Sequence, residues 1–291
     1  MKYLLAAAIL FLMQNPSVTD STSKFNTQLT TAFESFNSEA VEIYSDNTIH
    51  YNVTINTISH EVFADDGTLV ATYHYEYPQM QPVRGNGAII HTPNNKSEEH
   101  ALLVSQNFNN YFNDFQEEHS DYSKYAKDST AEELYLCKKN EGDGVFFPFY
   151  EEIKYADIYQ TDNIISLYGH FQSYTGGARP WKSSLGLNFD LKSGKFFSSE
   201  ILGKSNFNKA VAAEIIRQAN RYSEAPVNWQ DFVKDSAVKN WSDCVITFNN
   251  YGMVVTFPRL FTGEPTFLLP YEFLEPHLSN RGKILLGLYD N

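Results

Sequence analysis

The stretch Tyr174–Trp181, which reads YTGGARPW, concentrates residue types that suit recognition. Its adjacent glycines, Gly176 and Gly177, predict a two-residue hairpin turn, because glycine adopts the positive φ angles that such turns require. Arg179 offers a planar fork of donors to a carboxylate, and Trp181 offers a wide apolar face. Arginine and tryptophan are enriched at binding hot spots, so the stretch predicts a recognition tip.

Two further residues flank this turn. Pro180 donates no backbone N–H, which places it at a sheet edge or a bulge, and Tyr174 is a second stacking face. Strand alternation leaves open whether Trp181 points into the core or toward solvent, and the alternative interpretation is a hairpin with incidental aromatic residues. The candidate binding residues are Tyr174, Gly176, Gly177, Arg179, Pro180 and Trp181.

The patterns that catalytic and metal sites require do not occur in the sequence. No two of the 8 histidines lie three to five residues apart, and a G-x-S-x-G nucleophile motif is missing. Several acidic doublets occur, but a glycosidase needs two carboxyl groups at set separations across a cleft, which sequence neighbours do not report. We therefore expect no catalytic residues, no metal and no cofactor. A cell-wall hydrolase or esterase with a dispersed active site remains the alternative.

The formal charge of −13 bears on the class of partner. Nucleic-acid binding calls for a basic patch facing phosphate, and the sequence holds no Lys/Arg cluster, so we expect no nucleic-acid partner. An acidic surface instead attracts a basic protein through long-range electrostatic steering.

The N-terminus has the pattern of an export signal. Lys2 precedes an apolar run, Tyr3–Met13, and a polar Pro/Ser/Thr stretch follows. The run is shorter than the roughly 20 residues of a membrane-spanning helix. We expect a signal peptide over 1–19 and a flexible leader over 20–38, and hence a periplasmic or secreted protein with no membrane span after signal removal.

Only two cysteines occur, Cys137 and Cys244. In an exported protein they are a candidate disulfide, but sequence alone does not place them within bonding range. Buried free thiols are the alternative.

The elements that must position these residues alternate between strand groups and helices. Two β-rich runs flank the turn Ala64–Gly67, and Pro78, Pro82 and 85–93 predict an irregular loop. Ser97 is the expected cap of a long amphipathic helix with an apolar residue at every third or fourth position.

A meander of three strands follows over 146–191, and then helices over 206–222 and 229–239 precede further strands. This order predicts an α+β fold of two units in tandem, 39–194 and 195–291. We expect each unit to be an antiparallel meander packed by one long helix.

Several stretches together resemble a known family. YTGGARP followed by LNFDLKSGK, with YEYPQM, NNYGMVVTF and LPYEFLEPHL in the same order, is similar to an extracytoplasmic bacterial domain pair of unassigned function. The pair occurs in RsiV-type, lysozyme-responsive anti-sigma factors and ahead of the catalytic domain of PdaC-type peptidoglycan deacetylases. The resemblance covers most of the chain from about residue 40.

The resemblance implies an extracytoplasmic α+β protein of the cell envelope. With the acidic charge and the recognition tip, it leads us to expect an exported, non-catalytic binding module. The expected partner is a cell-wall-associated target, either a lysozyme-like basic protein or a peptidoglycan glycan.

Overall fold

The computed structural model describes residues 48–141, 145–177, 179–221, 229–257 and 265–289. The expected signal peptide and leader lie outside these residues. Within them the chain is a mixture of helices and strands, and the predicted α+β class is confirmed. None of the described helices is long and apolar enough to cross a membrane.

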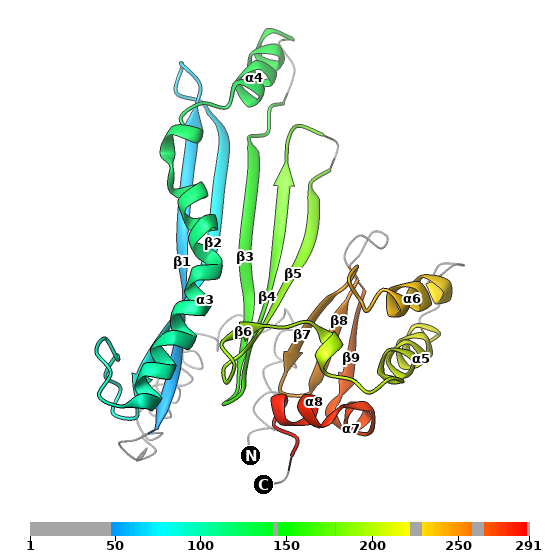
Figure 1. Cartoon of the computed structure of the whole chain (residues 1–291). Coiled ribbons are helices and arrows are strands. Elements are labelled where there is room, and N and C mark those ends of the chain that lie inside the picture. Colours follow the sequence, from blue (N-terminus) through cyan, green and yellow to red (C-terminus); the bar gives the residue numbers. More distant parts are fainter. Residues whose placement is uncertain (1–47, 142–144, 178, 222–228, 258–264, 290–291) are drawn as a thin grey trace, which may run out of the picture. The chain divides into compact units, whose positions relative to one another are not determined.

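The described strands form two sheets (Figure 1). The larger sheet contains, in spatial order, β1 (Ile49–Phe63), β2 (Leu69–Arg84), β3 (Phe149–Gln160), β4 (Ile164–Tyr174), β5 (Trp181–Asp190) and β6 (Lys195–Phe196). The smaller sheet contains β7 (Val245–Asn249), β8 (Gly252–Thr256) and β9 (Thr266–Pro270). All the pairings are antiparallel except that of β2 with β3, which joins the first hairpin to the meander through Ala71–Tyr75.

The structure confirms the first hairpin and the long helix that the sequence predicted. The turn between β1 and β2 closes where Ala64 N–H donates to the Thr68 carbonyl (2.8 Å), with Gly67 at φ +83°. Helix α3 (Lys96–Ser120) buries Val104, Phe108 and Phe112 against the larger sheet. The short helices η1 (Tyr122–Lys124) and α4 (Ser129–Glu141) follow it.

Two local predictions in this region are wrong. The cap of α3 is Asn95, whose side chain accepts a hydrogen bond from Glu98 N–H (3.0 Å), so Ser97 lies inside the first turn. Pro78 and Pro82 lie within β2, although the sequence predicted a loop there. The prolines fit because the pairing of β2 with β3 ends at Tyr75, and no described strand needs the N–H groups of Pro78 and Pro82 on that edge.

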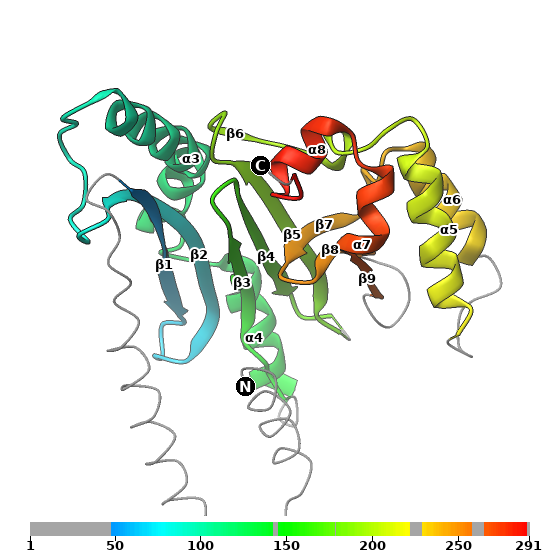
Figure 2. The same cartoon turned by 90° about the horizontal axis from the view of Figure 1, so that it is seen from below.

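The smaller sheet is covered by two helices of moderate length, and not by one long helix as expected. Helices α5 (Phe207–Ala219) and α6 (Trp229–Val238) pack together on one face of this sheet (Figure 2). Their buried side chains share a core with Phe248, Val255 and Phe267. The chain is completed by η2 (Ser199–Ile201), α7 (Tyr271–Leu274), η3 (Glu275–His277) and α8 (Asn280–Leu285).

The opposite face of the smaller sheet packs on β4 and β5 through specific polar contacts. Buried Ser166 donates to Asn188 Oδ1 (2.7 Å) and accepts from Phe248 N–H (2.8 Å). The Asn188 amide in turn donates to the Ile246 carbonyl (2.7 Å). At Gly186 a Cβ would collide with Val245, so glycine is what allows this close approach of β5 to β7. The two sheets are therefore held in a defined arrangement at this contact.

Both cysteines are unbonded in the structure. Cys137 is exposed on α4, whereas Cys244 is half-buried just before β7. Burial raises the pKa of the Cys244 thiol to about 12, which makes it a weak nucleophile at neutral pH.

Candidate functional site

The predicted recognition tip is the connection between β4 and β5, which has a different turn from the one expected. Strand β4 ends at Tyr174 and β5 begins at Trp181, so the connection spans 175–180, of which Ala178 lies outside the described residues. A two-residue turn is therefore wrong. Gly176 adopts a φ of +86°, whereas Gly177 is not among the glycines with positive φ.

Gly176 also fixes the tip against the rest of the molecule. A Cβ built on Gly176 would lie 2.6 Å from Leu134 Cδ2 and 3.0 Å from Phe149 Cε1. The backbone thus rests directly on α4 and on the first residue of β3. Gly177 by contrast faces open space. The sequence marked both glycines, but only the fold shows which of them is constrained.

The residues that follow the tip are accessible. Arg179 and Pro180 are exposed, and Trp181 keeps 43% of its surface exposed. Its ring meets the ring of Phe171 nearly edge-on, with centroids 5.1 Å apart. Trp181 is thus a supported surface ring and not a core residue, which answers the question that strand alternation left open.

Tyr174 belongs to the other face of the sheet. It pairs directly with Tyr150 on β3, and the two rings stack at a centroid distance of 6.1 Å. Trp181 pairs with Ser173, the neighbour of Tyr174, and therefore points to the opposite face. The structure brings Arg179, Pro180 and Trp181 to one end of β5, but it does not bring the Tyr174 and Trp181 rings together as one stacking surface.

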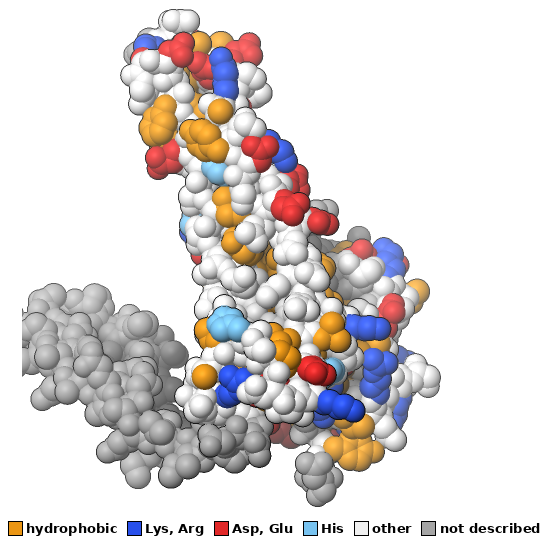
Figure 3. Space-filling view, turned by 60° about the vertical axis from the view of Figure 1, so that its left-hand side comes forward, with side chains coloured by type: hydrophobic (Ala, Val, Ile, Leu, Met, Phe, Trp, Pro, Cys, Tyr) orange, Lys and Arg blue, Asp and Glu red, His pale blue; other side chains and the backbone are white. Residues whose placement is uncertain are grey.

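The surface around this end of the sheet is acidic as well as apolar. In the face shown in Figure 3, acidic side chains predominate in the upper half, which contains α4 in Figure 1. Exposed hydrophobic residues at this end of the larger sheet include Phe63, Val145, Phe147 and Trp181. Exposed apolar side chains that lie together on a surface often mark a protein-binding site.

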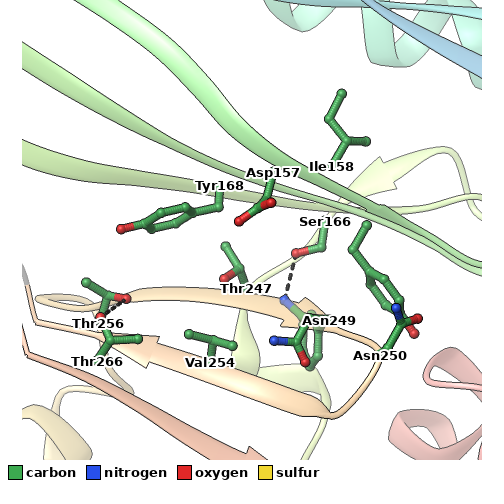
Figure 4. A pocket seen from close by; sticks show the side chains of 12 residues that line it. Asp157, Ile158, Ser166, Tyr168, Thr247, Asn249, Asn250, Val254, Thr256 and Thr266 are labelled. Carbon is green, nitrogen blue, oxygen red and sulfur yellow. Dashed lines mark hydrogen bonds between the residues drawn. The ribbon is translucent and has the colours of Figure 1, made fainter. Parts of the chain in front are cut away.

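A polar cleft that the sequence did not predict lies between the two sheets (Figure 4). Its volume is about 410 Å³. Asp157 and Tyr168 project into it from β3 and β4, and Thr247 faces them from β7 (Figure 4). The remaining lining residues are Ile158, Tyr159, Ser166, Phe248, Asn249, Asn250, Val254, Thr256 and Thr266.

A β-bulge directs Asp157 into this cleft. The register of β3 with β4 shifts between the pairs Tyr155↔Gly169 and Asp157↔Tyr168. In a regular strand Tyr155 and Asp157 would share a face, because side chains alternate with a period of two. The extra residue reverses that alternation and places Asp157 on the same face as Tyr168. Nothing in the local sequence marks this bulge, so composition and spacing did not identify the site.

A third cluster, near the end of α3, combines rings with titratable groups. Tyr75 donates to Glu151 (2.8 Å), Tyr73 donates to Asp128 (2.8 Å), and His119 Nδ1 lies 2.6 Å from the Tyr125 hydroxyl. Burial raises the pKa of both tyrosines on β2 and lowers the pKa of His119. These polar groups are paired with one another, so we interpret the cluster as a structural contact that holds the end of α3 against β2.

Comparisons with known proteins identify a similar fold and no sequence relative. No protein-family model matches the chain, and no curated protein matches it. Among solved structures, a DUF3298 family member from Bacteroides fragilis superposes with a TM-score of 0.52 at 13% identity, covering 84% of this chain and 100% of that one. This chain has a DUF3298-like fold.

A DUF3298 family protein from Pseudomonas aeruginosa is also similar, at 10% identity and a TM-score of 0.40. It covers 81% of this chain and 97% of that one. DUF3298 is an uncharacterised domain family, so the likeness describes architecture and assigns no ligand or reaction.

Proposed function

We propose that this protein is an exported, non-catalytic binding module that recognises a lysozyme-like basic protein through the end of β5. The observation that carries the proposal is the supported but exposed ring of Trp181, which is 43% accessible and rests on Phe171. An exposed aromatic ring on a strand is a rigid anchor that loses little conformational entropy on binding.

The tip offers the other properties of a protein-binding surface. Gly176 holds the connection against Leu134 and Phe149, so the binding residues need little reordering. The chain carries a formal charge of −13, which steers a basic partner toward it. Arg179 adds a planar donor that can pair with a carboxylate on the partner.

The target class comes from the resemblance of YTGGARP and LNFDLKSGK to the RsiV-type and PdaC-type domain pair. That resemblance also supports an extracytoplasmic location, as does the run Tyr3–Met13 behind Lys2. A peptidoglycan glycan is the second target that the resemblance supports, and the polar cleft suits it better than the tip does.

The alternative of a glycan hydrolase needs two carboxyl groups facing one another across a cleft. Among the described residues that line the cleft, Asp157 is the one carboxylate. The arrangement therefore favours binding over hydrolysis of a glycosidic bond.

The proposal is tested by titrating the purified mature protein with a C-type lysozyme in a calorimeter. We expect Trp181→Ala to weaken binding by about 2 kcal/mol or more, which is roughly thirtyfold in Kd. Tyr289→Ala is the matched control, because Tyr289 is similarly exposed at 48% and lies at the other end of the chain.

Raising the salt concentration should weaken the interaction, because exposed charges are screened. The proposal is wrong if the wild type does not bind the lysozyme, or if Arg179→Ala and Trp181→Ala both bind it as the wild type does.

A further inference from the structure

We propose that the cleft between β3–β4 and β7–β9 binds an uncharged saccharide. None of the tip residues lines this cleft, so the inference can hold even if the tip does not bind a lysozyme-like protein. It assigns a second binding site to the fold and names the chemical class of its ligand.

The lining chemistry disfavours an anionic ligand and suits a hydroxyl-rich molecule. The described lining residues include no Lys, Arg or His, so no cation is present to bind a phosphate or a carboxylate. They include one carboxylate, and no group of three metal-ligating side chains occurs in the described part of the chain. The polar groups that remain are hydroxyls and amides, which both donate and accept hydrogen bonds.

A purely apolar ligand does not suit this lining either. Thr247 is only 5% exposed, and its hydroxyl has no hydrogen-bond partner among the residues that the structure describes. The Thr247 side chain faces the cleft from the wall opposite Asp157 (Figure 4). An apolar molecule that covered this hydroxyl would leave it without a hydrogen-bond partner, at a cost in free energy.

Asp157 is the complementary acceptor on the opposite wall. Its carboxylate has no hydrogen bond or ion pair with any described residue, although the bulge in β3 has turned it into the cleft. A carboxylate accepts from two hydroxyl groups at once, which is the arrangement that vicinal hydroxyls on a sugar ring present. Asp157 and Thr247 therefore offer an acceptor and a hydroxyl to the two sides of one ring.

Tyr168 supplies a stacking surface for the apolar face of such a ring. Its hydroxyl lies 3.1 Å from Ser184 Oγ, and its ring meets that of His170 at 80° with centroids 4.9 Å apart. These two contacts fix the ring in place before a ligand arrives. Val254 adds apolar surface beneath, and the volume of about 410 Å³ falls within the usual range of small-molecule sites.

The test titrates the full mature chain with three probes up to millimolar concentration, using ligand-observed and protein-observed NMR. Tri-N-acetylchitotriose and cellotriose are the two saccharides, and a neutral tripeptide is the control ligand. We expect at least one saccharide to bind and the tripeptide not to bind. A preference for the first saccharide over the second would identify the N-acetyl group as part of what is recognised.

Two substitutions locate the site without disturbing the fold. Thr247→Val keeps the side-chain shape and removes only an unpaired hydroxyl, and Asp157→Ala removes a carboxylate that holds nothing in the free protein. Each should leave the melting temperature unchanged and weaken saccharide binding about three- to tenfold. Thr57→Val and Asp162→Ala are matched controls at exposed positions outside the cleft and should bind normally.

Trp181→Ala should also bind the saccharide normally, which separates this site from the tip. The inference is overturned if neither saccharide binds, if the tripeptide binds in their place, or if binding survives both Thr247→Val and Asp157→Ala unchanged.

Discussion

Substitution of the two tip glycines tests how the connection between β4 and β5 is held. Gly176 has a φ of +86°, and a side chain in this left-handed region costs about 1–2 kcal/mol. Its Cβ would also lie 2.6 Å from Leu134 Cδ2 and 3.0 Å from Phe149 Cε1, and pushing packed side chains apart costs about 1–3 kcal/mol. The Leu134 methyl can yield more easily than the buried Phe149 ring, so we expect Gly176→Ala to destabilise the fold by about 2–4 kcal/mol.

Gly177→Ala is the control that the chain itself provides. Its φ is not positive and its Cβ would meet nothing within 4 Å. An alanine there reduces the conformational entropy of the unfolded chain without straining the folded one. We therefore expect Gly177→Ala to raise the free energy of unfolding by about 0.4–1 kcal/mol. Both variants add the same methyl group, at positions one residue apart.

Urea denaturation followed by circular dichroism gives both free energies of unfolding, and thermal melts provide a second measure. At about 2–4 °C per kcal/mol for a chain of this size, the melting temperature of Gly176→Ala should fall at least several degrees below that of Gly177→Ala. Equal stability of the two variants would refute the reasoning, as would a larger loss for Gly177→Ala.

Two further predictions concern the buried Ser166 and the half-buried His119. Ser166→Ala should lower the free energy of unfolding by about 1–3 kcal/mol in urea titrations, because Phe248 N–H loses its acceptor at the contact between the sheets; an unchanged stability would show that this bond is unimportant. Burial lowers the pKa of His119 below 6.5 despite the opposing pull of Glu118 and Glu151, so the unfolded chain takes up this proton first as the pH falls. Stability should be full above about pH 6.5 and fall below it, and melts between about pH 8 and 5 should show a smaller fall for His119→Gln than for the wild type. If the melting temperatures of the wild type and of His119→Gln change with pH in parallel, His119 does not cause the loss of stability.

Local sequence patterns predicted those helices and strands whose formation depends on their own residues. The Asp-Gly turn after Ala64 specified the first hairpin, and the spacing of Val104, Phe108 and Phe112 specified α3. The cap was misplaced by two residues because Asn95 and Ser97 are both good caps, and only the backbone geometry distinguishes them.

The sites were harder to predict because they depend on contacts between distant segments. The glycine pair marked the tip, yet the constraint on Gly176 comes from Leu134 and Phe149, which sequence does not place beside it. The cleft needs a bulge in β3 and a contact between Ser166 and Phe248, which are 82 residues apart. Neither leaves a local pattern, so Asp157 and Thr247 looked like ordinary strand residues. The export signal and the partner stay predictions, whereas the candidate disulfide between Cys137 and Cys244 is not formed in the structure.

The way β2 ends its pairing has a consequence for how the protein avoids aggregation. Beyond Tyr75 no described strand pairs with the edge of β2 that faces away from β1, apart from the single bridge Val83↔Ile89, and an unpaired edge is a template on which another chain can add a strand. Here alternate residues along that edge leave no donor for an incoming strand. Pro78 and Pro82 have no N–H, Met80 N–H donates to Asn109 of α3 (2.8 Å), and Arg84 N–H donates to the Ala88 carbonyl (2.9 Å). The prolines that interrupted the strand pattern in the sequence thus remove two of the donors that an added strand would need at this edge.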